Sequence, residues 1–102
     1  MTAWQLRDYL IQAGHFDDFI AAWTAGVVPL RRRFGFEIQA WTVPAESRLI
    51  WILRYAGPTT FEEADHAYYD SPERAAIEPD PAQWIAEARK SWLTPVEEAA
   101  SE

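Results

Sequence analysis

Two kinds of hydrophobic periodicity follow one another along the chain. A strand-like run covers residues 4–11, and a stripe of apolar residues at three- and four-residue spacing then runs over residues 16–34. This order indicates a strand followed by a long helix. Two more strand-like runs occupy residues 36–43 and 49–55. A second helical region comes next, and a short apolar run at residues 92–96 is expected to be the last strand.

The order strand, helix, strand, strand, helix, strand is the plan of the ferredoxin-like fold. The sequence therefore predicts an α+β protein in which one four-stranded antiparallel sheet carries its helices on one face, with the strand order 4-1-3-2. A chain of 102 residues suits one domain. We expect that domain over residues 1–96 and a disordered acidic tail over residues 97–102.

The first and third strands predict how the two faces of the sheet are covered. On the first strand, one face is expected to carry Trp4, Leu6, Asp8 and Leu10. The other face is expected to carry Gln5, Arg7, Tyr9 and Ile11. The third strand is apolar at every position from 49 to 53, which is typical of a strand that is buried on both sides. Because helices cover only one face in this fold, we expect a second copy of the chain to cover the other.

The long helix is interrupted near its middle. Pro29 lacks the backbone N–H that would bond to the carbonyl of Ala25, and Gly26 weakens the same turn. A kink at this point either leaves a pocket between helix and sheet or only wraps the helix over a twisted sheet.

The second helical region divides into three parts. Thr60 and Glu63 have the spacing of a capping box at the start of a helix that is expected to extend to about Tyr69. Pro72 and Pro81 each suit the first position of a further helix. Residues 72–90 are therefore predicted to form two short helices.

Several segments together resemble the NIPSNAP family. The segments are Leu6-Arg7-Asp8-Tyr9, Gly14, Trp23, Val28-Pro29-Leu30, Arg33-Phe34-Gly35-Phe36, Trp41, and residues 49–55, 67–74 and 91–95. They span nearly the whole chain, and their order and spacing carry the resemblance. Residues 12–14 depart from it, because the family commonly has proline before the glycine.

The resemblance implies a dimeric α/β barrel, in which two ferredoxin-like sheets pack face to face. The wider superfamily includes antibiotic biosynthesis monooxygenases that need no cofactor, haem-degrading enzymes and small isomerases. The family has no agreed catalytic constellation that would transfer to this sequence, so function inferred from the superfamily is an analogy.

Net charge and composition exclude several functions. A formal charge of −7 argues against nucleic acid and anionic membranes as partners. The one basic cluster, Arg31-Arg32-Arg33, is either a solvated helix end or a binding patch. The N-terminal residues lack the features of a signal peptide, and no apolar run approaches the ~20 residues of a membrane span, so we expect a cytoplasmic protein.

Few residues have the type and spacing that catalysis needs. The chain has no cysteine, and neither of its two histidines has a partner at metal-binding spacing. A glycine-rich phosphate loop is missing too, so we expect neither a metal nor a cofactor. His66 is the best candidate for acid/base chemistry if its side chain faces the sheet, and is otherwise an ordinary residue on a helix surface.

Polar and aromatic side chains within the strands are candidates for ligand binding. Arg7, Arg54 and Glu37 would form a cross-sheet ion network, which is either structural or a site where an arginine orients an anionic or enolate oxygen. The candidate ligand-binding residues are Arg7, Tyr9, Trp41, Trp51 and Arg54.

Two hypotheses about function follow. The first is a protein that binds a small aromatic or polycyclic molecule in a pocket between sheet and helices, either without catalysis or as a cofactor-independent monooxygenase or isomerase. The alternative is a non-catalytic structural or interaction dimer, whose rings serve only its core and its interface and whose association depends on Trp51.

Overall fold

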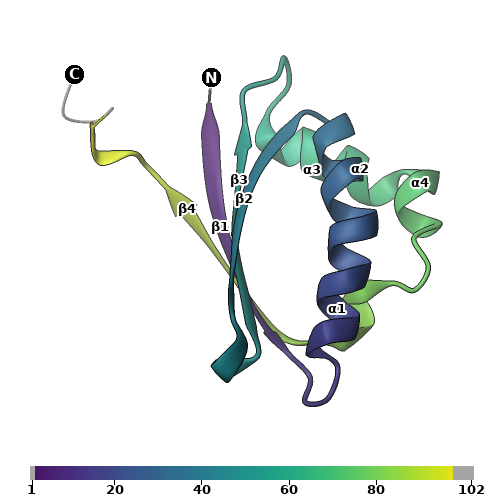
Figure 1. Ribbon diagram of the computed structural model, residues 1–102. Helices are drawn as coiled ribbons and strands as arrows, with labels where there is room; N and C mark the ends of the chain where they lie inside the picture. Colours follow the sequence, from purple (N-terminus) through teal and green to yellow (C-terminus); the bar gives the residue numbers. More distant parts are fainter. Residues whose placement is uncertain (1, 98–102) are drawn as a thin grey trace.

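The computed structural model describes residues 2–97, which form one antiparallel sheet with helices on one of its faces (Figure 1). The elements in chain order are β1 (Ala3–Ile11), α1 (Phe16–Ala22), η1 (Trp23–Val27), α2 (Val28–Arg33), β2 (Phe36–Val43), η2 (Pro44–Glu46), β3 (Arg48–Tyr55), α3 (Phe61–Asp70), α4 (Pro72–Ala75), η3 (Pro81–Trp84) and β4 (Ile85–Leu93). The strands lie in the order β2-β3-β1-β4. This is the predicted ferredoxin-like order, and the α+β fold is confirmed. Apart from Glu97, the predicted tail lies outside the described residues.

The register between strands determines which side chains share a face of the sheet. Arg7 on β1 lies opposite Trp51 on β3 and opposite Lys90 on β4. Directly opposed residues point to the same face of a sheet, so Arg7 and Trp51 both point toward the helices. The buried side chains of β1 are Gln5, Arg7, Tyr9 and Ile11, which is one of the two predicted faces.

A π-helical turn, η1, interrupts the long helix directly before Pro29. Figure 1 shows α1, η1 and α2 as one continuous helix that crosses the sheet. Pro29 falls in the first turn of α2, where the missing N–H is tolerated. Gly26 allows the chain to approach closely, because a Cβ atom at this position would lie 2.8 Å from the Cγ2 atom of Ile77. π-helical turns of this kind are frequent at functional sites.

The helix α3 begins as predicted. The hydroxyl of Thr60 accepts a hydrogen bond from the backbone N–H of Glu63 at 3.1 Å, and the Glu63 carboxylate accepts one from the backbone N–H of Thr60 at 3.2 Å. This reciprocal capping box satisfies two donors at the helix start. It holds in place the helix that supplies Asp65 and Tyr68 to the interior.

The last strand differs from the prediction. β4 begins at Ile85 rather than at residue 92, and the second predicted short helix is only the 3₁₀ turn η3. Most side chains of β4 are exposed, because it is an edge strand that pairs only with β1. Its place is determined by backbone hydrogen bonds along β1, so it needs no hydrophobic alternation.

The sheet face opposite the helices carries several apolar residues together with the ion pairs Asp8–Arg48 and Glu37–Arg54, and no described helix lies on it (Figure 1). Partly buried apolar residues there are Trp4, Leu6, Leu10, Ile50 and Ile52. Trp41, opposite Ile50, is 53 % exposed. On β3 only alternate residues are buried, so the apolar run at residues 49–53 has one side in the core and one on this open face.

Trp51 belongs to the helix-facing side, where it is almost fully buried. Trp51 therefore does not face a partner that packs on the open face, and the dependence of association on Trp51 stays a prediction. None of the helices within residues 2–97 has the length and apolar character to cross a membrane.

Candidate functional site

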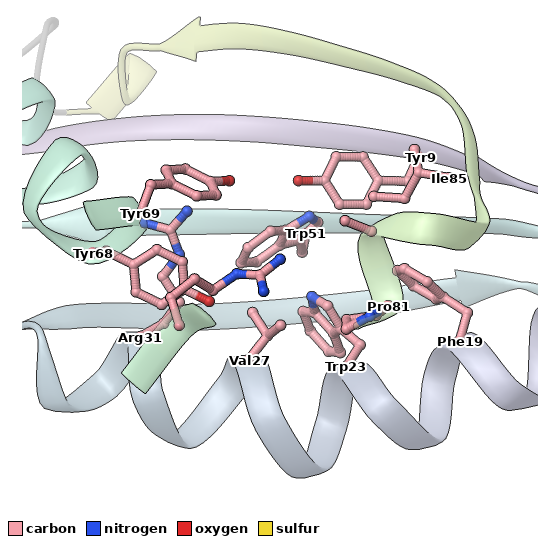
Figure 2. Close-up of a pocket in the computed structure, with 12 residues that line it drawn as sticks. Tyr9, Phe19, Trp23, Val27, Arg31, Trp51, Tyr68, Tyr69, Pro81 and Ile85 are labelled. Atoms are coloured by element: carbon pink, nitrogen blue, oxygen red, sulfur yellow. The ribbon is translucent and has the colours of Figure 1, made fainter. Parts of the chain in front are cut away.

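A small cavity of about 70 Å3 lies between the sheet and the helices (Figure 2). Tyr9 and Trp51 line it from the sheet, and Trp23 and Val27 line it from the π-helical turn. Figure 2 shows the hydroxyl groups of Tyr9 and Tyr69 pointing toward each other. The interruption of the long helix thus coincides with a pocket, which is one of the two predicted alternatives.

Arg7 is fully buried beside this cavity, and each of its three nitrogen atoms donates a hydrogen bond. Nε donates to Oε1 of Gln5 at 2.8 Å, one Nη atom to the Tyr69 hydroxyl at 2.9 Å, and the other to Oδ1 of Asp65 at 3.0 Å. Burial alone would lower the pKa of Arg7, but Tyr9, Tyr69 and Asp65 together outweigh it, and the pKa is raised. Arg7 is therefore a permanent cation.

Arg31 is a second buried guanidinium, 0 % exposed. One of its Nη atoms donates to the same Oδ1 atom of Asp65, at 2.7 Å. The guanidinium carbon lies 3.8 Å from the centroid of the Tyr68 ring and 4.8 Å from that of Phe36, which is cation–π geometry. Neither prediction for the basic cluster describes Arg31, because its side chain is inside the protein while that of Arg32 is exposed.

Several buried donors around the cavity have no hydrogen-bond partner within the described part of the chain. They are the Tyr68 hydroxyl, the Nε atoms of Arg31 and Arg74, and the indole Nε1 atoms of Trp23 and Trp51. Burial raises the pKa of Tyr68 to about 12, although nearby Arg31 acts in the opposite direction. Burial also raises the pKa of Tyr9. Both phenols are therefore protonated at neutral pH, and the cavity is rich in donors.

The raised pKa of Tyr68 predicts a loss of stability at alkaline pH. Below pH ~10 the phenol is protonated in the folded and the unfolded chain, so its titration has no effect on stability. Between pH ~10 and ~12 the unfolded chain releases the proton while the folded chain retains it, so the free energy of unfolding falls. Between pH ~9 and ~11.5 we expect the free energy of unfolding to fall by about 2 kcal/mol less in Tyr68→Phe than in the wild type, as measured by urea unfolding. Equal losses of stability in the variant and the wild type would show that burial does not raise the pKa of Tyr68.

The five predicted ligand-binding residues are divided between the two faces of the sheet. Tyr9 and Trp51 line the cavity, and Arg7 lies beside it, in contact with Tyr69 and Trp51. Arg54 and Trp41 lie on the opposite, open face. The structure thus brings three of the five together.

The predicted network of Arg7, Arg54 and Glu37 is wrong, because Arg7 and Arg54 point to opposite faces. Arg54 pairs instead with Glu37, and its guanidinium carbon lies 5.2 Å from the ring centroid of Trp4. Trp4, Glu37 and Arg54 border a separate hollow of about 330 Å3 on the open face.

His66 lies outside the cavity. Its side chain is 80 % exposed, and its Nε2 atom is 2.8 Å from Oδ2 of Asp70, one helical turn away on α3. The role in proton transfer required His66 to face the sheet, and it does not. Within residues 2–97 no three side chains of metal-ligating type come together.

Sequence reasoning missed Arg31, Asp65 and Tyr68. Arg31 follows Trp23 and Val27 at four-residue spacing, so it continues the buried stripe of the long helix. Tyr68 likewise follows Phe61 and Ala64 on the buried side of α3. Asp65 carries no such signal, because it is placed by the two arginines that it pairs with.

Comparison with known proteins gives similarity in structure only. No protein-family model matches the chain, and no curated protein matches its sequence. A NIPSNAP family protein from Agrobacterium tumefaciens superposes with a TM-score of 0.81 at 14 % identity, with 95 % of each chain covered. An uncharacterised NIPSNAP domain protein from Burkholderia xenovorans superposes with a TM-score of 0.77 at 15 % identity, with 94 % of this chain and 95 % of that chain covered.

A further similar structure is a protein from Bacteroides thetaiotaomicron that is provisionally described as an antibiotic biosynthesis monooxygenase. It superposes with a TM-score of 0.74 at 13 % identity, with 93 % of this chain and 90 % of that chain covered. Identities this low establish a common fold and no more than that. The chain therefore has, over nearly its whole length, the fold of these NIPSNAP proteins, and the Bacteroides protein shares that fold.

Proposed function

We propose that the chain binds a small aromatic or polycyclic molecule in the cavity between its sheet and its helices. The observation that carries this proposal is the combination of aromatic walls with buried donors that have no partner among the described residues. Ligand pockets combine apolar walls with a few polar groups that orient the ligand. In a core that serves stability alone, each such donor would cost about 1–3 kcal/mol without any compensating contact.

An aromatic ring needs more room than the cavity offers in this conformation. The volume of about 70 Å3 is smaller than the roughly 150 Å3 of an engineered cavity that binds benzene. Tyr69 is 45 % exposed, and its hydroxyl accepts a hydrogen bond from Arg7. In this proposal Tyr69 turns outward as the ligand enters, which adds the space of its own ring to the site.

The test uses 2-naphthol, which is uncharged at neutral pH, and ligand-observed NMR. Val27→Phe fills the cavity from the π-helical turn, and we expect it to abolish the transfer of saturation from protein to 2-naphthol. Thr42→Phe is the control, because Thr42 is exposed on β2 and is not part of the cavity wall. Near-UV circular dichroism checks that both variants are folded. Unchanged binding by the Val27 variant would place the ligand elsewhere.

Catalysis on the bound molecule is the second candidate function. The structural similarity to a protein described as a monooxygenase favours it, and Arg31, which lines the cavity, would stabilise a negative charge on a ligand oxygen. The described residues that line the cavity include no histidine, aspartate or glutamate, and burial raises the pKa of Tyr9 and of Tyr68, so both phenols are protonated at neutral pH. A reaction here would therefore start from a ligand that is already ionised, and binding is the better-supported function.

We also propose that a second copy of the chain covers the open face of the sheet, as in a dimeric α/β barrel. The apolar residues on that face and the exposed Trp41 support a partner there, since exposed apolar patches often mark protein–protein interaction sites.

Sedimentation velocity tests this assembly. Ile52→Glu introduces a charge on the open face, and we expect it to convert a dimer into a folded monomer. Thr42→Glu is the matched control, since Thr42 is on the other face of the sheet and exposed. A wild type that sediments as a monomer at tens of micromolar would contradict the proposal.

A further inference from the structure

We infer that the ligand presents an anionic oxygen, as an aromatic carboxylate, enolate or phenolate does, and that Arg31 is the residue that binds it. This inference rests on the proposed function and specifies the chemical class of its ligand.

The charged groups around the cavity do not cancel. Arg7 and Arg31 share the single carboxylate of Asp65, through the same oxygen atom. Arg74, which also lines the cavity, pairs with Asp80 at 3.0 Å. Three guanidinium groups therefore face two carboxylates, which leaves one positive charge uncompensated in a chain whose net charge is −7. A buried charge without a counterion is costly, so this arrangement favours an anionic ligand.

Arg31 is better placed than Arg7 to meet that anion. All three nitrogen atoms of Arg7 already donate hydrogen bonds. Arg31 makes one hydrogen bond, to Asp65, and its buried Nε atom has no partner within residues 2–97. Asp65 and the ring of Tyr68 hold the Arg31 guanidinium in position, so little side-chain freedom is lost when an oxygen binds.

The uncharged groups around Arg31 also favour an oxygen acceptor. The Tyr68 hydroxyl and the indole N–H groups of Trp23 and Trp51 are buried donors without acceptors among the described residues. The Arg31 guanidinium carbon lies 3.8 Å from the ring centroid of Tyr68 and 5.9 Å from that of Trp51, and Trp23 lines the same cavity (Figure 2). A flat anion fits this arrangement, because its ring lies against aromatic walls while its oxygens accept hydrogen bonds from the charged and neutral donors.

The experiment compares acids with their neutral amides of nearly the same shape. Dissociation constants of benzoate and benzamide, and of 2-naphthoate and 2-naphthamide, are measured by NMR titration at neutral pH. We expect each acid to bind at least about tenfold more tightly than its amide, the effect of one charge-assisted hydrogen bond. Arg31→Gln should remove this preference, and Arg31→Lys should retain part of it. Arg32→Gln, which changes the exposed neighbour on the same helix, should leave it intact.

Tyr68→Phe provides a second variant in case Arg31→Gln does not fold. It removes only the hydroxyl, and we expect it to weaken acid binding by about threefold to tenfold. If acids and amides bound equally well, the inference would be overturned while the proposed function would stand. The same would follow if 2-naphthol bound and neither the acids nor the amides did. An acid preference that survives Arg31→Gln, or that disappears with Arg32→Gln, would show that the anion binds elsewhere. If none of these compounds bound, both the inference and the proposed function would fail.

Discussion

Replacing Asp65 with alanine is expected to lower the free energy of unfolding by about 3–5 kcal/mol, because it leaves two buried cations without their shared counterion. Arg7 and Arg31 both donate to Oδ1 of Asp65 and are themselves fully buried. Removing one partner of a buried ion pair lowers stability more than replacing both partners with apolar residues does, since the remaining charge stays buried without a partner. Urea unfolding followed by circular dichroism measures the loss.

Asp70→Ala is the matched control for this substitution. Asp70 is on the same helix, but it is largely exposed, and its ion-pair partner among the described residues is the exposed His66. We expect its removal to change stability by less than about 0.5 kcal/mol. Arg31→Met should cost less in the Asp65→Ala background than in the wild type, because it removes one of the unpaired charges. A loss below about 1 kcal/mol for Asp65→Ala would contradict the shared-counterion arrangement.

Replacing Trp51 with alanine is expected to cost about 3–5 kcal/mol of stability, the usual range for removing a large aromatic side chain from a core. The Trp51 ring makes edge-to-face contacts with Tyr9 and Trp23, at centroid distances of 5.9 and 5.1 Å. It also lies under the guanidinium of Arg31, at 5.9 Å. The substitution therefore removes the central wall of the cavity as well as core volume, and thermal unfolding measures the loss.

Trp41→Ala separates the contribution of the core from that of the open face. Trp41 is on the adjacent strand but exposed on the other side of the sheet. In dilute solution we expect its removal to change stability by less than about 1 kcal/mol and to weaken self-association instead. If Trp51→Ala altered association and left stability unchanged, the assignment of Trp51 to the core would be wrong.

The sequence was sufficient to predict the order of strands and helices and the buried face of β1. Period-2 alternation identified Arg7 and Tyr9 as neighbours on one face, and the capping box located the start of α3. β4 was missed because an edge strand held by backbone pairing needs no apolar pattern. Its boundary is set by the length of β1 rather than by its own residues.

The candidate site could be predicted only where the alternation along a strand determines which face of the sheet a side chain points to. Arg7, Tyr9 and Trp51 are brought together by the pairing of β1 with β3, whereas Arg54 and Trp41 required a register that sequence periodicity does not specify. Arg31 was hidden in a basic cluster, whose composition indicates a helix end even though its spacing continues the buried stripe. Pairing of Arg31 with Asp65 is a tertiary contact between two helices, and neither helix alone reveals it.

The most direct test of the cavity as a ligand site follows the indole N–H signals in a ¹H–¹⁵N NMR titration with 2-naphthol. The chain has six tryptophans. Trp23 and Trp51 line the cavity, whereas Trp41 and Trp92 are exposed outside it. We predict that the signals of Trp23 and Trp51 shift during the titration while those of Trp41 and Trp92 remain in place. Shifts confined to Trp41 and Trp92, or no shift of any indole signal, would contradict the account.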